Sequence, residues 1–392
     1  MLSATSAFTD SKRIELLMNR RETLAAMGGV AGLALLGGAA RAADGVSPEN
    51  VSPAAARLYQ NALVFDANLS PPLSDKFPFP KEMIDTIRQS GVTAVKTSLG
   101  GFEGSFEDTV GEIAFFQRVF EEYPGVFLQV RRHRDFEEAK RTKRMGVLLS
   151  FEAVSPLDAK VDRIELFRGL GVRVMQITYN KASPFGMGVL GDPNGSLTPL
   201  GAQAVTAMNT QGVAIDLSHS NEPTSFEVLK ITSKPALVTH AGCAAVHPHP
   251  RHKSDALLRA LAQKGGVIGI YDLCYLTASP KQPDLDDYMA HMTHALNICG
   301  EDHVGIGSDS GLEPWDTSPA AMAAYNKNEQ ERHKAGVAAP EEDRPLYVIG
   351  LNTPRRSEVI ADALLKRGYS ARVAEKVLGL NFTNALGNIW QD

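Results

Sequence analysis

The sequence predicts an α/β protein with the (β/α)8 TIM-barrel fold, and three observations support this prediction. After about residue 60, short apolar runs alternate with longer stretches of helical periodicity. Eight such runs occur, which is the number of strands in a closed barrel. The runs are apolar almost throughout, as expected for parallel strands that are covered on both faces.

The expected strands are spread over most of the chain of 392 residues. They are residues 62–66, 92–98, 146–151, 172–178, 212–217, 236–239, 266–271 and 303–307. Helical patterns lie between them, for example at 200–211, 254–264 and 286–299. A doubly wound open sheet is the alternative. It would normally carry a glycine-rich phosphate loop after its first strand, and this sequence has none there.

Several segments lie outside this alternation. Residues 43–60 form an N-terminal segment, and the barrel domain spans 61–392. Residues 183–196 are rich in glycine and proline, which predicts a long loop on the active-site face. Residues 312–345 form a polar insertion that is either a lid or a disordered surface loop. Residues 355–390 return to helical periodicity, which predicts C-terminal helices.

Residues 1–42 have the layout of a twin-arginine-type export signal. Arg20 and Arg21 precede a Gly/Ala-rich apolar run, and Ala40-Arg41-Ala42 has the A-x-A pattern of a cleavage site. This predicts that the twin-arginine export machinery carries the chain to the periplasm or the exterior. A retained membrane anchor is the less favoured alternative, because the apolar run is short and glycine-rich for a span.

Charge and cysteine content disfavour two classes of protein. Lys and Arg number 40 against 45 Asp and Glu, a net charge of −5, with no basic block. A nucleic-acid-binding protein needs a basic face, so we expect a small-molecule partner instead. Cys243, Cys274 and Cys299 are an odd, sparse set without a CxxC pair, which is not a disulfide framework.

Polar residues follow the expected strands where a barrel carries its catalytic groups. Glu152 follows the third strand, His219 follows the fifth, and His240 follows the sixth. The carboxyl ends of barrel strands meet at one face, where these nitrogen and oxygen ligands suit zinc. Asp309 follows the eighth strand and could accept a proton from an attacking water. Each residue alone is more often structural, but together they predict a barrel of the metal-dependent hydrolase type.

Longer motifs around these residues closely resemble the membrane dipeptidase (renal dipeptidase) family of amidohydrolase-like zinc peptidases. They are DLSH (216–219), VTHAGCAAVHPHPRHKSD (238–255), KGGVIGI (264–270), HVGIGSD (303–309) and ALLKRGYSARVAEKVLGLNF (363–382). The motifs keep the order and spacing of the family from about residue 60 to the C-terminus. The resemblance implies a (β/α)8 barrel with two zinc ions that cleaves dipeptides, and homodimers are common in that family.

The resemblance also implies roles for single residues of the metal site. Glu152 corresponds to the glutamate that bridges the two zinc ions. His219 and His240 correspond to the histidines that hold the second zinc, and Asp309 corresponds to the catalytic aspartate.

The same resemblance implies three substrate-binding residues. Arg251, in a Pro-Arg-x-x-x-Asp pattern that ends at Asp255, corresponds to the arginine that binds the substrate carboxylate. A guanidinium suits that task because its planar fork forms two hydrogen bonds to a carboxylate. Tyr179 stands where the animal enzyme has the histidine that polarises the scissile carbonyl, and its hydroxyl can also donate to an oxyanion.

The first metal site departs from the family pattern. The family has Asp-Gly-His-x-Asp at the end of the first strand, whereas this chain has Asp66-Ala67-Asn68-Leu69-Ser70. Asn68 and Ser70 therefore replace a histidine and an aspartate, and neither an amide nor a hydroxyl is a good zinc ligand. We expect one zinc ion per chain rather than two.

Three functions remain open from the sequence. The first is an exported dipeptidase-like hydrolase that cleaves a dipeptide or a similar small amide bearing a carboxylate. The second is a recruited periplasmic enzyme of the same fold that tailors a peptide-derived metabolite by non-peptidase chemistry. The third is an inactive binding protein, which the retained Asp309 disfavours because a binder has no use for a base there.

Overall fold

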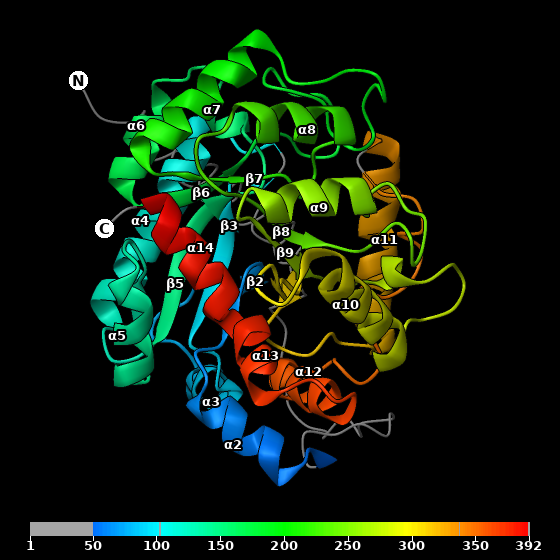
Figure 1. Cartoon of the computed structure of the whole chain (residues 1–392). Helices are drawn as coiled ribbons and strands as arrows, with labels where there is room; N and C mark the ends of the chain where they lie inside the picture. Colours follow the sequence, from blue (N-terminus) through cyan, green and yellow to red (C-terminus); the bar gives the residue numbers. More distant parts are fainter. Residues whose placement is uncertain (1–49, 102, 337, 391–392) are drawn as a thin grey trace, which may run out of the picture.

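The computed structural model describes residues 50–390 except 102 and 337, and its centre is a closed barrel of eight parallel strands (Figure 1). The predicted export signal lies outside the described residues. All eight expected strands are confirmed. In ring order they are β1 (Phe65–Asp66), β3 (Ala94–Leu99), β5 (Met145–Phe151), β6 (Val172–Gln176), β7 (Ala214–Asp216), β8 (Ala236–Ala241), β9 (Val267–Ile270) and β10 (Val304–Ile306).

Strand pairing closes the ring at β1. Asp66 is in register with Ile306 of β10 on one side and with Val95 of β3 on the other. A further strand that the sequence analysis missed, β4 (Phe127–Gln129), pairs with the first half of β5. The second half of β5 pairs with β6 instead, so β4 lies outside the eight-membered ring.

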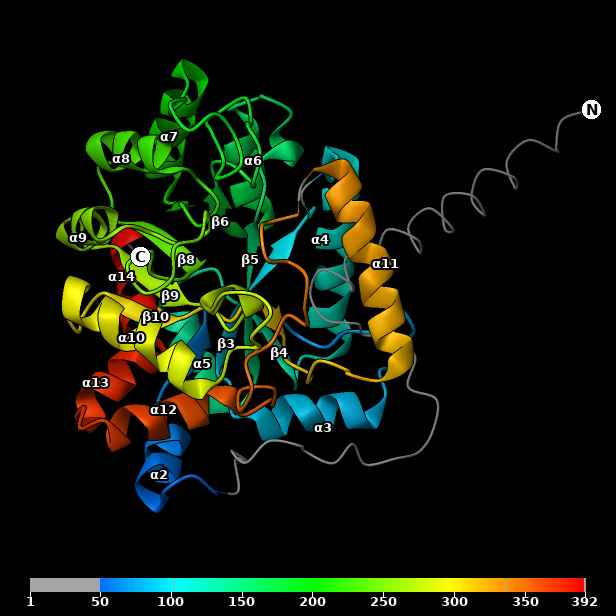
Figure 2. The same ribbon diagram turned by 90° about the vertical axis from the view of Figure 1, so that its right-hand side faces the viewer.

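Helices surround the barrel, as Figures 1 and 2 show from two directions. Capping residues begin several of these helices. Ser105 and Asp284 each form a capping box, and Thr198 caps a helix whose first residue is a proline. The helices before the C-terminal group are α2 (Pro53–Asn61), α3 (Lys81–Ser90), α4 (Phe106–Glu122), α5 (Arg134–Thr142), α6 (Arg163–Leu170), α7 (Pro199–Gln211), α8 (Glu222–Ile231), α9 (Asp255–Gln263), α10 (Leu285–Cys299) and α11 (Pro319–Ala335).

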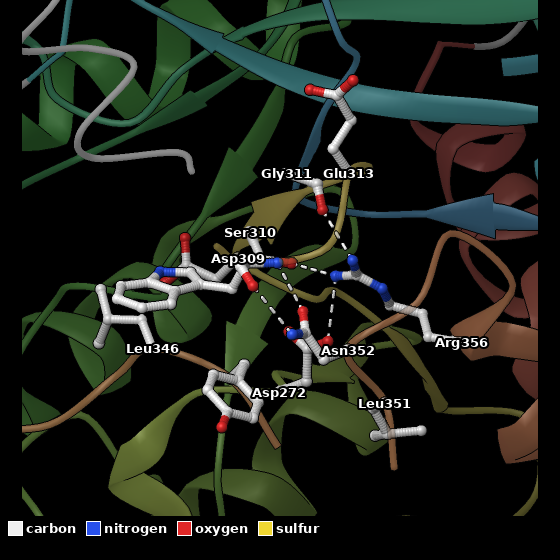
Figure 3. Close-up of a pocket in the computed structure, with 11 residues that line it drawn as sticks. Asp272, Asp309, Ser310, Gly311, Glu313, Leu346, Leu351, Asn352 and Arg356 are labelled. Atoms are coloured by element: carbon white, nitrogen blue, oxygen red, sulfur yellow. Dashed lines mark hydrogen bonds and ion pairs between the residues drawn. The ribbon is translucent and has the colours of Figure 1, made fainter. Parts of the chain in front are cut away.

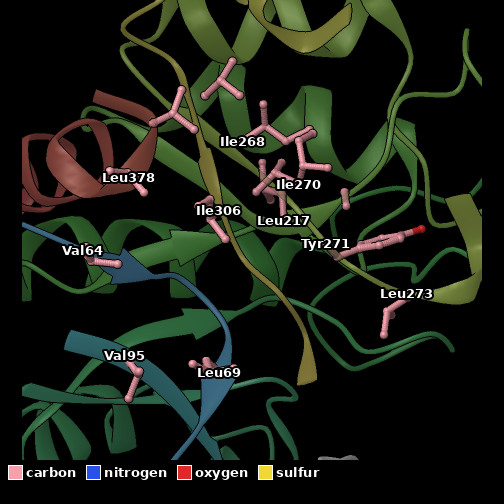
Figure 4. Close-up of a cluster of buried hydrophobic side chains, with 14 of the residues drawn as sticks. Val64, Leu69, Val95, Leu217, Ile268, Ile270, Tyr271, Leu273, Ile306 and Leu378 are labelled. Carbon is pink, nitrogen blue, oxygen red and sulfur yellow. The ribbon is translucent and has the colours of Figure 1, made fainter. Parts of the chain in front are cut away.

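Two hydrophobic layers hold this arrangement together. Alternate strand residues point outward and pack under the helices, among them Val95, Ile268 and Ile306 (Figure 4). The other residues point into the barrel, where Ala94, Leu148 and their neighbours form a second cluster. This division of each strand between two apolar layers explains why the strands appear as continuous apolar runs in the sequence.

The last helices of the chain are α12 (Arg356–Lys366), α13 (Ala371–Glu375), the short η4 (Lys376–Leu380) and α14 (Asn381–Trp390). Of these, α14 closes the amino-terminal end of the barrel, where its apolar side chains join the inner cluster. Phe382 meets the Phe65 ring edge-on, with centroids 6.1 Å apart, and Trp390 stacks on Phe136 at 6.0 Å. Because this end is filled by apolar side chains, polar chemistry is confined to the carboxyl ends of the strands.

The polar insertion at 312–345 contains an ordered helix, α11, which Ser318 caps. The hydroxyl of Tyr325 donates to the carbonyl of Arg344, and Lys181 donates to the carbonyl of Ala335. The insertion is therefore tied to the loop after β6 and takes part in the barrel mouth, rather than being a disordered loop. Among the described residues, no helix is both long and apolar enough to cross a membrane.

Candidate active site

Glu152, His219 and His240 meet at the carboxyl end of the barrel. Glu152 directly follows β5, His219 comes after β7 with two residues between them, and His240 lies within β8. The two Nε2 atoms are 3.0 Å apart, and Glu152 Oε1 lies 3.2 Å from His219 Nε2 and 3.4 Å from His240 Nε2. Their potential ligand atoms all lie within 4.8 Å of one another, a spacing that one metal ion can bridge.

The partners of His219 fix which nitrogen faces this cluster. Its Nδ1 lies 2.7 Å from the side-chain oxygen of Asn180, which can only accept a hydrogen bond. Nδ1 therefore carries the proton, and Nε2 presents its lone pair to the centre. The Tyr179 ring stacks on the His219 ring at 4.3 Å between centroids and holds the imidazole plane.

A second chain of hydrogen bonds orients His240. Its Nδ1 lies 2.9 Å from the Thr239 hydroxyl, which lies 2.5 Å from Asp216 Oδ2. The hydroxyl has one proton, and the carboxylate takes it, so the hydroxyl oxygen accepts the Nδ1 proton of His240. Asp216 thus acts through Thr239, and His240 also directs Nε2 to the centre.

The protonation states of the cluster suit a metal site. Burial and the charge of Arg251 hold the pKa of His219 well below the ordinary histidine value, so its imidazole is neutral. Burial would raise the pKa of Glu152, but the neighbouring His219 and His240 rings outweigh burial and hold that pKa well below the usual range. A neutral imidazole and an ionised carboxylate are the forms that bind metal.

Asp309 faces the same cluster from the loop after β10. Its Oδ2 lies 3.9 Å from His240 Nε2 and 4.0 Å from Arg251 Nη2. Asp309 has a left-handed backbone conformation with φ of 59°, which residues other than glycine seldom adopt without local support.

Arg356 supports that loop (Figure 3). Its guanidinium forms a 3.1 Å ion pair with Asp272, donates to the Ser310 hydroxyl, and donates to the Gly311 carbonyl at 2.8 Å. Burial raises the pKa of Asp272 to about 6, and the charge of Arg356 opposes this rise. The two residues after Asp309 are therefore held by a cation that the sequence analysis did not single out.

A pocket of about 500 Å³ opens over the cluster. Arg251 lines it, and the Nε and Nη2 atoms of this arginine are buried without a hydrogen-bond partner in the described part of the chain. The insertion contributes Glu329, Arg332 and Glu342 to the wall. The other lining residues are Glu152, Tyr179, Asn180, Leu273, Tyr275, Asp309 and Leu346.

Comparison with known proteins agrees with this geometry. A family model described as "Membrane dipeptidase (Peptidase family M19)" matches residues 80–323. This protein belongs to the membrane dipeptidase family. The family is metal-dependent, and the cluster of Glu152, His219 and His240 provides a candidate metal site on this chain.

Individual relatives show how far the similarity extends. The chain is 28% identical to an uncharacterized protein in the pqqA 5' region of Klebsiella pneumoniae, over 66% of this chain and 87% of that one. It is 25% identical to the dipeptidase tcpJ of Claviceps purpurea, over 73% of this chain and 60% of that one. A solved amidohydrolase from Pseudomonas aeruginosa superposes with a TM-score of 0.75 at 27% identity, covering 86% of this chain and 99% of that chain.

Asn68 and Ser70, the residues expected at the first metal position, are held by contacts within the barrel. The Asn68 amide oxygen accepts a 2.9 Å hydrogen bond from Lys96, and its nitrogen donates to Asp309 at 2.7 Å. Ser70 lies in β2 (Leu69–Ser70), whose backbone pairs with β11 (Ser310–Gly311). Neither side chain carries a carboxylate or an imidazole. The Asn68 amide already forms hydrogen bonds at both its oxygen and its nitrogen.

Asp255 is a predicted substrate-binding residue that does not line the pocket. It begins α9, and its Oδ1 lies 2.7 Å from His294 Nε2. It is absent from the residues that line the pocket. The structure therefore gives Asp255 a place at the start of a surrounding helix, next to a histidine of α10.

Proposed function

We propose that this protein is a metal-dependent hydrolase that cleaves a dipeptide or a similar small amide bearing a carboxylate. One observation carries the proposal: Glu152 of the candidate metal cluster lines the same pocket as Arg251, whose buried guanidinium has two nitrogens without a hydrogen-bond partner among the described residues. A buried donor without a partner is costly, so this arginine is prepared for an anionic ligand group. Two parallel hydrogen bonds to a carboxylate would satisfy it.

Each residue has a task in this reaction. Glu152, His219 and His240 would hold a divalent ion, which we expect to be zinc and which supplies Lewis acidity for amide cleavage. Arg251 holds the substrate carboxylate and so places the scissile amide over the cluster. Asp309 takes the proton of the attacking water, because its free carboxylate oxygen faces His240.

Tyr179 is suited to stabilise the negative charge that develops on the substrate carbonyl. It lines the pocket next to Glu152 and stacks on His219. Burial raises the pKa of Tyr179 to about 12, so the phenol keeps its proton at neutral pH. A protonated phenol can donate a hydrogen bond to an oxyanion.

The activity can be tested with zinc-loaded protein and a panel of dipeptides, including L,L and L,D stereoisomers. Each substrate is compared with its C-terminal amide, which lacks the carboxylate. We expect hydrolysis of the free dipeptides, a large loss for the amides, and no hydrolysis by a His219→Ala variant. Equal turnover of acids and amides would remove the role of Arg251, and no turnover at all would contradict the peptidase proposal.

A second candidate is the recruited enzyme of non-peptidase chemistry. The engagement of Asn68 with Lys96 favours it, because this chain differs from the family expectation at the residues next to the reacting centre. A panel without dipeptide turnover, in protein that nevertheless binds one zinc per chain, would support this candidate.

We further propose that the chain is exported through its twin-arginine-type signal. The support is the order of Arg20-Arg21, apolar run and Ala40-Arg41-Ala42. Intact mass spectrometry of protein from the periplasm should show a chain that begins at Ala43. Protein that retains residues 1–42 would contradict cleavage.

A further inference from the structure

Lys96 is a buried cation inside the barrel that none of the proposed steps uses. It lies on β3, where Ala94 belongs to the inner cluster and Val95 to the outer one. Because strand residues alternate between faces, Lys96 points into the barrel like Ala94, and it is 1% exposed. An enclosed lysine is rare unless it is paired, so this position calls for an explanation.

The contacts of Lys96 are those of an ammonium ion. Its Nζ lies 2.9 Å from Asn68 Oδ1, 3.2 Å from Ser150 Oγ and 3.4 Å from Ser98 Oγ. The Ser150 hydroxyl donates its own proton to the Thr97 carbonyl at 2.8 Å, so it offers only lone pairs to the lysine. Three acceptors therefore match the three donors of a charged amine.

The electrostatic surroundings act in opposing directions. Burial lowers the pKa of Lys96, and the carboxylates of Asp216, Glu152, Asp309 and Asp66 offset this lowering only in part. The lysine is thus a buried amine enclosed among four acidic groups at the carboxyl end of the barrel. Removing it would leave those carboxylates with less compensation, which is costly in a buried site.

Asn68 transmits the influence of Lys96 to Asp309. The amide oxygen faces the ammonium, which can only donate, and the amide nitrogen faces the carboxylate, which can only accept. Both neighbours therefore select the same orientation of the amide. The result is a continuous row from Lys96 through Asn68 to the Asp309 carboxylate.

The net charge of Lys96 with its three acceptors equals that of a divalent ion held by one histidine and one carboxylate. A divalent ion held by a neutral histidine and one carboxylate adds one net positive charge to its surroundings. An ammonium held by an amide and two hydroxyls adds the same net charge without any ion. The ammonium also contacts Asn68, the residue that stands at the histidine position of the expected first metal site.

We propose that the Lys96 side chain takes the place of the first metal ion, positions Asn68 and Asp309, and restricts this site to one divalent ion. The proposal rests on the metal cluster of the proposed function but not on dipeptide cleavage. Lys96 is a positioning residue, because it reaches the reacting centre only through Asn68. It follows that restoring a histidine and an aspartate on the first strand is not sufficient for a second ion.

Zinc binding by a set of variants tests this proposal. Each purified protein is dialysed against buffered Zn²⁺, and its zinc content is measured by mass spectrometry of the elements. The wild type and an Asn68→His/Ser70→Asp variant should each bind one ion. The triple variant that adds Lys96→Met should bind two, since the ammonium no longer repels the second cation. Two ions in the double variant, or one in a folded triple variant, would overturn the proposal.

A single substitution provides a test that does not depend on the redesigned site. Lys96→Met removes a positive charge near the cluster, so zinc should bind about tenfold more tightly or better by calorimetry. Lys96→Gln keeps a donor near Asn68 without the charge, and should show the same gain if it is the charge that matters. Lys230→Met on the exposed face of α8 is the control. Unchanged or weaker zinc binding in both Lys96 variants, with circular dichroism like that of the wild type, would refute the role.

These outcomes separate the two proposals. A wild type that binds one zinc and cleaves no dipeptide contradicts the proposed function and leaves the role of Lys96 in place. A wild type that binds two zinc ions contradicts the role of Lys96, even if dipeptides are cleaved.

Discussion

The side-chain amide of Asn68 donates a 2.7 Å hydrogen bond to the carboxylate of Asp309, which lies 241 positions later in the chain. The backbone N–H of Asp309 also donates to the carbonyl of Asn68 at 2.7 Å. These two bonds join the end of the first barrel strand to the loop after the last one. Asn68, which we expect at a metal-ligand position of the family, thus supports Asp309, the proposed base.

Asn68→Ala should lower kcat while leaving the zinc content unchanged. The carboxylate of Asp309 would lose the hydrogen bond from the Asn68 amide, and with it a fixed orientation. We expect a loss of about 10-fold to 100-fold, the scale found for groups that orient an active residue. Steady-state kinetics on a cleaved dipeptide measures this, with Asn61→Ala on the exposed end of α2 as control. An unchanged kcat would show that Asp309 needs no support from Asn68.

Thr239→Val should weaken zinc binding without touching a ligand atom. Valine keeps the shape of threonine but cannot accept the Nδ1 proton of His240 or donate to Asp216. We expect the dissociation constant for zinc to rise about 10-fold to 100-fold. Calorimetric titration gives this value, and Thr206→Val on the exposed side of α7 is a matched control. If both variants bind zinc like the wild type, the Asp216–Thr239–His240 row has no part in metal binding.

Arg251→Lys should raise KM more than it lowers kcat. Lysine keeps the charge but loses the planar fork that forms two hydrogen bonds to a carboxylate. Binding that is shared by the ground state and the transition state affects KM chiefly, so kcat should fall less. Initial rates over a range of dipeptide concentrations separate the two constants. A fall in kcat at constant KM would instead place Arg251 next to the reacting bond.

The fold could be predicted because buried parallel strands have a strong sequence signature. Most of the eight strands are largely apolar runs, and Glu152, His219, His240 and Asp309 lie at or shortly after the ends of these runs. β4 was missed because it lies outside the eight-membered ring and depends on pairing with β5. Its place is set by a partner strand and not by a local pattern.

The parts of the site that escaped prediction depend on register and direction. Lys96 interrupts an apolar strand, which is a signal in itself, but only the closed barrel shows that it meets Asn68 and Ser150. Asp255 shares a sequence motif with Arg251, yet the chain enters α9 at that residue and the helix leads away from the pocket. The insertion could not be placed because its helix is fixed by contacts with Lys181 and Arg344.

Arg356→Met should destabilise the protein strongly. The substitution leaves the buried Asp272 carboxylate without its cation and frees the loop that carries Asp309. Breaking a buried pair in this way typically costs about 3–5 kcal/mol. An Asp272→Asn/Arg356→Met variant should regain part of that loss, since it leaves no unpaired buried charge. Thermal and denaturant unfolding of the single and double variants measure the coupling, and strictly additive losses would show that the two residues act independently.

The stability of the insertion should depend on pH through Glu329. Burial and the neighbouring Glu342 raise the pKa of Glu329 to about 8. For Glu342, hydrogen bonding and the charge of Arg332 outweigh burial and hold the pKa below its usual range. The folded chain therefore keeps a proton on Glu329 that the unfolded chain has lost above its ordinary pKa of 4.5. Because the folded state binds more protons in this window, its stability should fall as pH rises from about 4.5 to 8.

Glu329→Gln isolates this contribution, because glutamine has the shape and charge of the protonated acid. The variant should match the wild type near pH 5 and melt at a higher temperature at pH 8, where the wild type must keep a carboxyl protonated or separate two carboxylates. Glu331→Gln on an exposed position of the same helix controls for the loss of one surface charge. Melting temperatures that differ equally from the wild type at pH 5 and pH 8 would rule out a titrating Glu329. If the difference grows with pH, a protonated Glu329 beside Glu342 stabilises α11 over the pocket.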